Sequence, residues 1–302
     1  MKQKTVLITG ATAGIGQEAA KQLATMGANV VIAGRNTQKC QSVAEKLKRE
    51  TENDQIHYLV ADLSHQAGVE QLGIDFKARF NRLDVLLNNA GAFYMNRIEN
   101  QDQIEMTVAL NHLGYFVLTH SLLDVLKATP NARIINVASD AHSGARLNPD
   151  DFEMKSSFSG WTQYSNSKLM NILFTYELAK RLKGTNVTAN CLHPGFVASD
   201  FGDNNGKGKG IFGDAINVVW RLIKKMAAVS VEKGAENQVY LASSPDVEGV
   251  SGQYFVKKRP SPLLMPHTTP PCRMPCGLGP KLKPEFRWPN NRFCAFLPIW
   301  LI

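Results

Sequence analysis

Seven short apolar segments alternate with longer segments of helical periodicity along the first 256 residues. Most of the apolar segments are rich in Val, Ile and Leu, as strands buried on both faces should be. They are Thr5–Thr9, Asn29–Ala33, Ile56–Val60, Val85–Leu87, Arg133–Val137, Asn186–Cys191 and Gln253–Val256. The helical segments are Gly16–Met26, Thr37–Thr51, Ala67–Phe80, Asp102–Lys127, Tyr164–Lys183 and Val231–Ser243. Strands alternating with helices predict an α/β fold, here a doubly wound Rossmann-type parallel sheet of seven strands with helices on both faces.

The composition changes near residue 260. Residues 260–302 hold ten of the 14 prolines and three of the five cysteines. Proline at this density interrupts helices and sheets. We therefore expect one domain over residues 1–259 and an irregular, basic, Pro-rich tail over 260–302. Cys272 and Cys276 lack a second ligand pair at metal-binding spacing, so no metal is expected.

The net charge is +8, and the tail, with five basic residues and one acid, accounts for +4 of it. No basic stripe interleaved with aromatic residues appears, which argues against nucleic acid as a partner. No segment approaches the ~20 apolar residues of a membrane-spanning helix, and the first residues do not resemble a signal peptide. We expect a cytoplasmic protein whose Cys40 and Cys191 are reduced.

Two segments interrupt the alternation. Residues 140–162 are long and polar and are expected to form a loop at the rim of a site. Residues 211–229 are amphipathic, with apolar residues at helical spacing opposite basic ones. This second segment has three interpretations: a helix packed on the domain, a lid over an apolar substrate, or a helix on a membrane surface. Peripheral membrane contact therefore stays open.

The first strand ends in a glycine-rich turn, Thr9-Gly10-Ala11-Thr12-Ala13-Gly14-Ile15-Gly16, and a helix follows. Glycines let the backbone approach a pyrophosphate, and a helix N-terminus supplies amide donors and a favourable dipole. The sequence therefore predicts a dinucleotide site. Its candidate contacts are Gly10, Thr12, Gly14, Ile15 and Gly16.

The end of the second strand indicates which dinucleotide. Enzymes that prefer NAD usually carry Asp or Glu there for the ribose 2′-hydroxyl. This chain has Gly34-Arg35 instead, and an arginine suits a 2′-phosphate, so NADP(H) is predicted. Asp62 and Leu63, after the third strand, are candidate adenine contacts, although an Asp at this place also suits a helix cap.

Ser139 follows the fifth strand, and Tyr164 and Lys168 are four residues apart in a predicted helix. That spacing places both side chains on one helix face. A phenol of pKa ~10 is a poor proton shuttle at neutral pH, and a nearby lysine favours its phenolate. We therefore predict that Tyr164 is the acid/base, that Lys168 together with an oxidised nicotinamide lowers its pKa, and that Ser139 holds the substrate oxygen. Tyr164 and Lys168 are also predicted cofactor contacts, Lys168 through the nicotinamide ribose.

Together with Asn88-Asn89-Ala90-Gly91 and His193-Pro194-Gly195-Phe196-Val197, these motifs resemble the short-chain dehydrogenase/reductase family over residues 4–259. The resemblance implies that Asn89, Ala90 and Gly91 lie beside the cofactor ribose and that Asn111 anchors a water; alternatively, Asn111 merely bends a helix. It also implies that the segment after the sixth strand contacts the nicotinamide through Pro194, Gly195, Val197 and Ser199. At the last of these positions the family commonly has Thr, and this chain keeps a hydroxyl with Ser199.

Within the family, Asn136–His142 and Leu192–Gly195 are similar to the retinol-dehydrogenase-like group. That likeness implies an NADP(H)-dependent oxidoreductase that transfers hydride to or from the carbonyl or alcohol carbon of a lipophilic substrate, retinal-like or a medium-chain aldehyde or ketone. It leaves a homodimer open. Two alternatives are a non-catalytic NADP(H)-sensing or interaction protein and a protochlorophyllide-type double-bond reductase.

Overall fold

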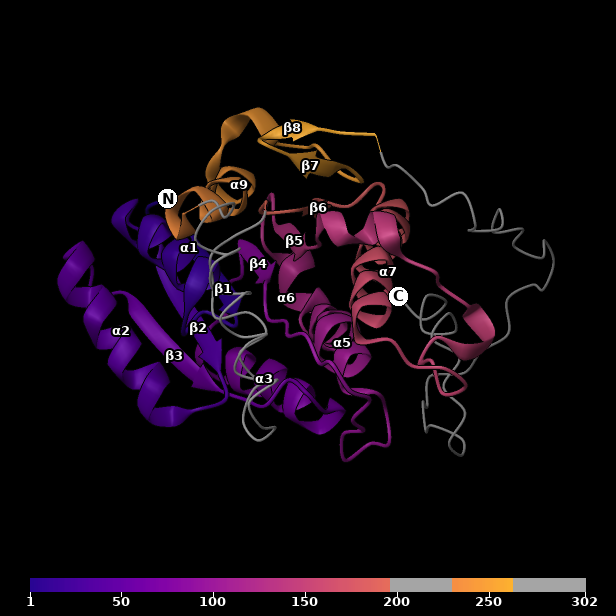
Figure 1. Cartoon of the computed structure of the whole chain (residues 1–302). Helices are drawn as coiled ribbons and strands as arrows, with labels where there is room; N and C mark the ends of the chain where they lie inside the picture. Colours follow the sequence, from indigo (N-terminus) through magenta and orange to yellow (C-terminus); the bar gives the residue numbers. More distant parts are fainter. Residues whose placement is uncertain (196–229, 263–302) are drawn as a thin grey trace, which may run out of the picture.

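The computed structural model describes residues 1–195 and 230–262 of the 302-residue chain. Its centre is one sheet in the order β3-β2-β1-β4-β5-β6-β7-β8 (Figure 1). The strands are β1 Thr5–Thr9, β2 Asn29–Gly34, β3 Ile56–Val60, β4 Val85–Asn88, β5 Arg133–Val137, β6 Thr188–Leu192, β7 Tyr254–Val256 and β8 Arg259–Pro260. The order reverses between β1 and β4, which confirms the doubly wound sheet.

Seven strands are parallel, as predicted, and β8 is an antiparallel addition at the edge. It pairs with β7 through a tight turn in which Lys257 and Lys258 have φ of 48° and 63°. Two consecutive positive φ values give a turn whose twist suits a hairpin. A two-residue strand has no periodicity to recognise in a sequence, and its Pro260 is tolerated because it lies at the sheet edge.

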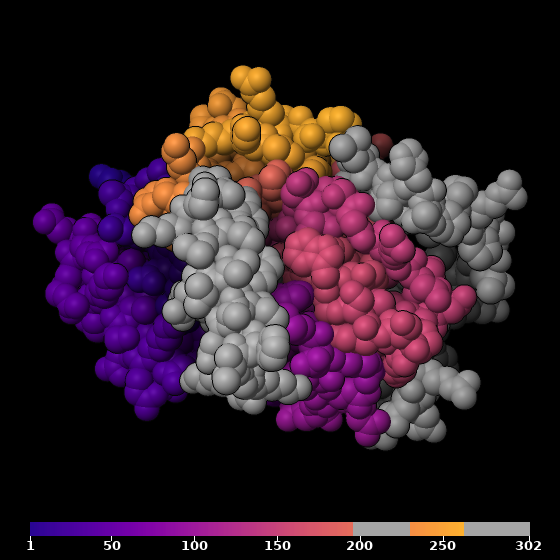
Figure 2. All heavy atoms as spheres, viewed as in Figure 1, coloured from indigo at the N-terminus to yellow at the C-terminus, as the bar shows by residue number. Residues whose placement is uncertain are grey.

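Helices cover both faces of the sheet. They are α1 Gly14–Thr25, α2 Thr37–Thr51, α3 Gln66–Arg79, α4 Met106–Val108, α5 Gly114–Ser121, α6 Leu123–Ala128, α7 Gly160–Arg181 and α9 Val231–Ser243. One face carries α1, α2 and α9, and the other carries α3, α5, α6 and α7. In the space-filling view, the segment from α9 to β8 forms the upper edge of the visible face (Figure 2).

Alternate residues of each central strand belong to different halves of the core. Val6 and Ile8 of β1 pack into the cluster under α1, α2 and α9, whereas Leu7 packs into the cluster under α3, α5, α6 and α7. Successive strand side chains point to opposite faces, so a strand covered on both sides must be apolar throughout. This explains why the strand segments of the sequence are continuous apolar runs.

The predicted helix Asp102–Lys127 is wrong as one element. The chain forms α4, a π-helical turn over Ala109–Leu113, then α5 and α6, with a break at Leu122 (φ −109°, ψ 5°). The helical part begins only at Met106 because the side chain of Glu105 accepts hydrogen bonds from the amides of Thr107 and Val108, both at 2.9 Å. A cap made by a glutamate is not visible in hydrophobic periodicity.

Glu105 also connects α4 to α7. Its carboxylate is fully buried and also accepts from Thr107 Oγ1 at 2.9 Å and from Gln163 Nε2 at 3.2 Å. Glu105→Ala would leave these buried donors without their acceptor, so we expect a loss of about 3 kcal/mol in the free energy of unfolding. Urea denaturation measures it. Glu99→Ala, which removes a 45% exposed partner of Arg97, is the matched control and should cost less than about 0.5 kcal/mol. Equal losses of stability in the two variants would contradict the conclusion that Glu105 holds α4 and α7 together.

Candidate active site

The glycine-rich turn between β1 and α1 is shaped by the segment that follows β4. Gly10 has φ +64°, and a Cβ there would lie 2.8 Å from Ala90 Cα. A Cβ on Gly16 would meet the side-chain amide of Asn89 and lie 2.8 Å from the Gly10 carbonyl oxygen. Since Cβ atoms do not approach backbone this closely, both positions require glycine. The turn therefore lies directly against residues 89 and 90.

Among the helices of 12 or more residues in residues 1–195 and 230–262, α1 is the one that begins without a side-chain cap. Asn36, His65, Ser159 and Ser230 cap α2, α3, α7 and α9. The first turn of α1 also contains no acidic residue. Open amides and the positive end of the helix dipole suit an anionic pyrophosphate, so the residues present fit the predicted group. Thr12, Gly14 and Ile15 are all partly exposed at this turn.

Asn89 holds the glycine-rich turn in place through hydrogen bonds. Its side-chain nitrogen donates to the Thr9 carbonyl at 2.9 Å, and its side-chain oxygen accepts from Gln238 Nε2 of α9 at 3.0 Å. Its backbone amide and that of Ala90 both donate to Thr9 Oγ1, at 2.9 and 3.0 Å. Both polar atoms of the Asn89 side chain are thus hydrogen-bonded to other residues of the protein. Gly91 is exposed, and a Cβ there would lie 3.4 Å from Lys168 Nζ.

Arg35 lies exposed at the end of β2, beside the end of β3. A Cβ on Gly34 before it would lie 2.7 Å from Thr12 Cγ2 and 3.0 Å from Cys40 Sγ. An acid at position 34 would therefore have to displace these side chains. Arg35 remains the polar group that faces outward there.

Asp62 lies close enough to Arg35 to interact electrostatically. Burial raises the pKa of its carboxyl, but hydrogen bonds from Ser64 and the charges of His65 and Arg35 outweigh burial and lower the pKa overall. The helix-cap alternative fails, because His65 Nδ1 accepts from the Gly68 amide and caps α3.

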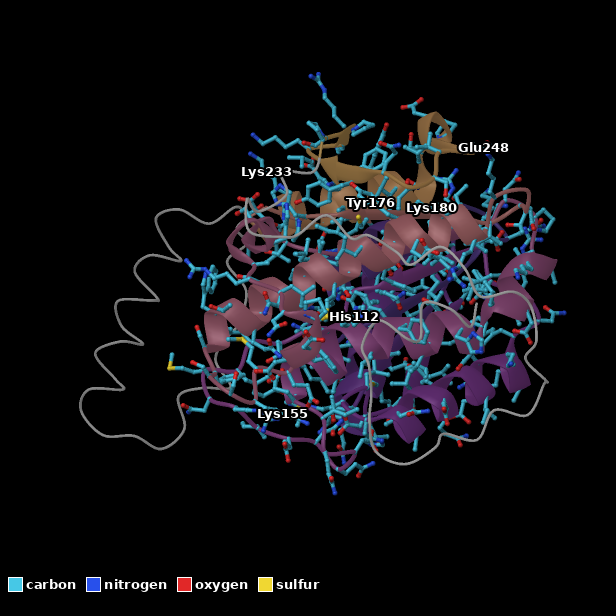
Figure 3. The ribbon with its side chains drawn as sticks, turned by 90° about the vertical axis from the view of Figure 1, so that its right-hand side faces the viewer. His112, Lys155, Tyr176, Lys180, Lys233 and Glu248 are labelled. Atoms are coloured by element: carbon cyan, nitrogen blue, oxygen red, sulfur yellow. The ribbon has the colours of Figure 1, made fainter. Side chains whose placement is uncertain are left out.

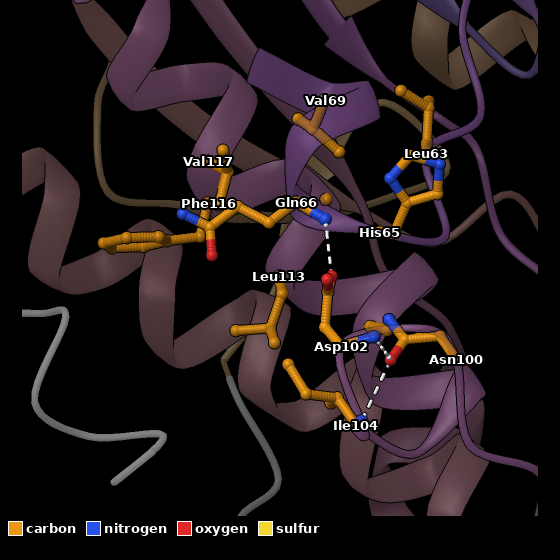
Figure 4. Close-up of a pocket in the computed structure, with 12 residues that line it drawn as sticks. Leu63, His65, Gln66, Val69, Asn100, Asp102, Ile104, Leu113, Phe116 and Val117 are labelled. Carbon is orange, nitrogen blue, oxygen red and sulfur yellow. Dashed lines mark hydrogen bonds between the residues drawn. The ribbon is translucent and has the colours of Figure 1, made fainter. Parts of the chain in front are cut away.

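The side chain of Leu63 is buried and lines a small apolar pocket between α3 and α5 (Figure 4). Asp102 closes one side of this pocket by accepting a hydrogen bond from the Gln66 amide at 2.8 Å. Only the backbone of Leu63 is left for the predicted cofactor contact.

Ser139, Tyr164 and Lys168 converge as the spacing predicts. Tyr164 and Lys168 are one turn apart on α7, 8% and 3% exposed. Ser139 follows β5, and its hydroxyl is hydrogen-bonded to the Tyr164 phenol. Lys168 Nζ donates to the Val137 carbonyl at 3.1 Å and lies 5.7 Å from the centre of the Tyr164 ring. A hydroxyl, a phenol and an amine thus lie close together at the carboxyl end of β5.

Burial controls the protonation of this group. It raises the pKa of Tyr164 to about 12, against the smaller lowering effect of the hydrogen bond with Ser139. Burial also lowers the pKa of Lys168 to about 7. Burial therefore dominates the pKa of Tyr164 in the protein by itself, and the lowering of that pKa by Lys168 together with an oxidised nicotinamide stays a prediction. The phenol is neutral at physiological pH, and the amine titrates close to it.

Asn111 occupies the π-helical turn and is fully buried. Its side chain accepts from the Ala92 amide at 2.8 Å and donates to the Ala92 carbonyl at 3.0 Å and to Ser167 Oγ at 3.1 Å. Its carbonyl accepts from Asn171 Nδ2 at 2.9 Å. π-turns are frequent at functional sites. Asn111 therefore joins the segment after Gly91 to the helix that carries Lys168, one residue after Ser167.

Next to Asn111, His112 contacts Asn171 through Nδ1 at 3.1 Å. It lies inside the protein beside α7 (Figure 3). Burial lowers its pKa to about 4, so it is neutral at physiological pH.

The segment after β6 is described only as far as residue 195. Gly195 has φ 85°, and its amide donates to His193 Nδ1 at 3.1 Å. The ring of His193 stacks on Tyr254 at 6.1 Å, and burial lowers its pKa. The predicted contacts Val197 and Ser199 lie outside the described residues. So do the amphipathic segment 211–229 and almost all of the tail, so those interpretations stay predictions.

Two aromatic residues near Tyr164 were missed by the sequence analysis. Phe93 and Trp161 have ring centres 6.1 and 6.0 Å from that of Tyr164. Neither belongs to a recognised motif. The three-residue spacing of Trp161 and Tyr164 is the one sequence signal that could have paired them.

A second, broader hollow is lined by Tyr176, Lys180 and Glu248 among others (Figure 3). At ~1.5 Å per residue of α7, Tyr176 lies about 18 Å from Tyr164, so this hollow is separate from the site. Among the described residues, no cluster of His, Cys, Asp and Glu could hold a metal ion. Over the same part of the chain, every helix is too short or too polar to cross a membrane.

Comparisons with known proteins agree with this geometry. The family model described as short chain dehydrogenase matches residues 4–210. Retinol dehydrogenase 13 of Homo sapiens is 36% identical over 265 residues, which cover 86% of this chain and 78% of that protein. Polyprenol dehydrogenase of Homo sapiens is 36% identical over 262 residues, 85% of this chain and 77% of that one. The crystal structure of a short chain dehydrogenase from Burkholderia cenocepacia in complex with NADP has a TM-score of 0.63 at 24% identity, covering 84% and 95% of the two chains.

Proposed function

The chain belongs to the short-chain dehydrogenase family and resembles its retinol dehydrogenases, and we propose that it reduces the carbonyl group of a lipophilic aldehyde or ketone with NADPH, and catalyses the reverse oxidation. The convergence of Ser139, Tyr164 and Lys168 on one point carries this proposal. When bound, the nicotinamide supplies the hydride that adds to the carbonyl carbon. The protein must then supply one proton to the carbonyl oxygen.

Tyr164 is the proton donor in this proposal. Its Oη–H is neutral in the protein because burial raises its pKa to about 12, and a neutral phenol is the form that can donate. Ser139 Oγ, bonded to the same phenol, donates to the carbonyl oxygen and orients it. Reduction therefore starts from the protonation state that the folded protein favours, whereas oxidation of an alcohol has to begin with a phenolate.

Lys168 stabilises the charge that remains. Once Tyr164 has given up its proton, a cationic Lys168 favours the phenolate. With a pKa near 7, the amine carries this charge increasingly as the pH falls through neutrality. Asn111 keeps α7 in register with the segment after Gly91 through its bonds to Ala92 and Ser167, and we assign it a supporting role.

For the cofactor, Gly10, Gly14 and the open amides of α1 would receive the pyrophosphate, and Arg35 the 2′-phosphate. A preference for NADP(H) is consistent with Gly34, where a Cβ would lie 2.7 Å from Thr12 Cγ2 and where the chain has no acid for a ribose 2′-hydroxyl. Lipophilic substrates are proposed on the strength of the relatives, whose names are those of a retinol and a polyprenol dehydrogenase.

The decisive experiment measures NADPH oxidation by the purified full chain with retinal, a medium-chain aldehyde, a diketone and a steroid ketone, with NADH in parallel. Turnover that prefers NADPH supports the proposal. Failure to bind either dinucleotide in calorimetry would overturn it. Tight NADPH binding without turnover of any substrate would favour the non-catalytic alternative.

Arg35→Gln tests the choice of cofactor. A charge-assisted hydrogen bond to phosphate is worth about 1.5–3 kcal/mol, so KM for NADPH should rise by roughly 10- to 100-fold. KM for NADH should change less than about threefold, since NADH lacks the phosphate. Steady-state kinetics with both cofactors measure the effect. Arg79→Gln, an exposed arginine bonded to the Tyr58 carbonyl in β3, is the control and should change neither constant. A parallel rise for NADH and NADPH would refute the assignment of Arg35.

A further inference from the structure

We propose that Trp161 determines substrate specificity by binding the apolar, unsaturated body of the substrate beyond its carbonyl group. This inference rests on the proposed function, and it names the side chains that select among carbonyl compounds. No motif in the sequence points to it, because the aromatic surface is assembled from two segments far apart in the chain.

Trp161, Tyr164 and Lys168 form one stripe along α7. Residues three and four apart lie on the same face of a helix. Along this stripe the exposed fraction falls from 52% at Trp161 to 8% at Tyr164 and 3% at Lys168. The reacting groups are therefore at the buried end. In this proposal, a substrate whose carbonyl oxygen reaches Tyr164 extends toward solvent along Trp161.

Phe93 supplies a second wall from the segment after β4. Its ring lies 6.3 Å from Trp161 and 6.1 Å from Tyr164, edge-to-face with both at 68° and 89°. The rings of Trp161 and Tyr164 are 6.0 Å apart and tilted by 37°. Such offset and T-shaped contacts are favourable in themselves, so the aromatic surface is held in place before a substrate binds.

Glycine at position 160 makes this arrangement possible. A Cβ on Gly160 would meet the Tyr94 carbonyl and lie 2.9 Å from Met95 Cα. Only glycine therefore lets the first turn of α7 approach the segment that carries Phe93. On the other side, a Cβ on Gly144 would lie 4.0 Å from Trp161 Nε1, so the indole also borders the turn that follows Ser139.

The outer part of this surface is exposed and apolar: Trp161 is 52% exposed, and Met95, whose backbone lies against Gly160, is 47% exposed. Large exposed apolar side chains grouped at the mouth of a site indicate ligand binding. An indole face favours flat partners, because aromatic groups stack in offset geometry. The preferred class is a carbonyl compound conjugated to an aromatic ring or polyene, rather than a short saturated aldehyde that ends before it reaches Trp161.

The test compares cinnamaldehyde with butanal as substrates, using NADPH. In Trp161→Ala the ratio of kcat/KM for cinnamaldehyde to that for butanal should fall about tenfold, mainly through KM. Trp161→Phe, which keeps an aromatic face, should recover most of the ratio. Met26→Ala, which removes a 43% exposed apolar side chain at the end of α1, is the control and should leave the ratio unchanged. A ratio that stays constant in Trp161→Ala would overturn the inference, since Trp161 would then only support α7.

A binding measurement separates this inference from the proposed reaction. Calorimetry of cinnamamide with the NADPH-loaded protein requires no turnover. Binding that weakens about tenfold in Trp161→Ala supports the inference even if wild type reduces no aldehyde, in which case the proposed function alone fails. Equal affinity in wild type and variant counts against Trp161 whatever the catalytic result.

Discussion

Turnover of an aldehyde with NADPH should fall by about 10²- to 10⁴-fold in Tyr164→Phe, the usual range for loss of a general acid. The variant keeps the ring and therefore its contacts with Phe93 and Trp161, but it has no proton to give. NADPH affinity should stay within about threefold, and the unfolding midpoint should hardly move, because the lost hydrogen bond with Ser139 is worth only about 1 kcal/mol. Single-turnover kinetics under saturating cofactor isolate the chemical step.

Tyr115→Phe is the matched control for this variant. The Tyr115 ring lies 5.7 Å from the same Lys168 Nζ, and its hydroxyl is buried with no hydrogen-bond partner in the described part of the chain. Removing that hydroxyl should leave turnover within about twofold. If Tyr164→Phe kept more than a tenth of the wild-type rate, Tyr164 would not be the proton donor, and another acid near Ser139 would have to replace it.

Lys168→Met should reduce turnover by about 10²-fold and, at the same time, stabilise the protein at low pH. Burial lowers the pKa of Lys168 from 10.5 to about 7. Below pH 7 the folded and unfolded chains both hold the proton, and the folded state bears the full cost of the buried charge. Between pH 7 and 10.5 the unfolded chain binds more protons, so wild-type stability rises with pH.

The size of this effect follows from the pKa difference. Relative to wild type, Lys168→Met should gain about 4 kcal/mol in the free energy of unfolding on going from pH 10 to pH 6. Urea denaturation at the two pH values measures it. Lys180→Met, at a 70% exposed position of the same helix, should show no such pH dependence. A stability difference independent of pH in Lys168→Met would mean that burial does not lower the pKa of Lys168 and that the amine stays charged in the folded protein across this range.

Wild-type reduction should also be faster below pH 7 than above it, since protonated Lys168 favours the phenolate left on Tyr164. The sign of this pH dependence follows from the burial of Lys168 in the structure, not from the sequence motif. The spacing of Tyr164 and Lys168 shows only that they share a helix face; it says nothing of how deeply that face is buried.

Much of the molecule was predictable because local patterns carry it. A strand covered on both sides must consist of a continuous apolar run such as Val30–Ile32. Such a run can be recognised in the sequence without knowing which strands lie beside it. The turn at Gly10 and the spacing of Tyr164 and Lys168 are likewise local. The doubly wound sheet, the family and the convergence of three reactive side chains follow from such features.

Other features depend on residues that are far apart in the sequence and meet only in the tertiary structure. Glu105 sets where the helical part before Asn111 begins and reaches Gln163, and Gly160 lets α7 approach the segment of Phe93. In the protein by itself, the pKa of Tyr164 is raised because the chain packed around it removes water from the phenol. Hydrophobic periodicity reports on the two or four nearest residues along the chain, whereas burial, hydrogen-bond partners and electrostatics depend on which distant segments the sheet order brings together.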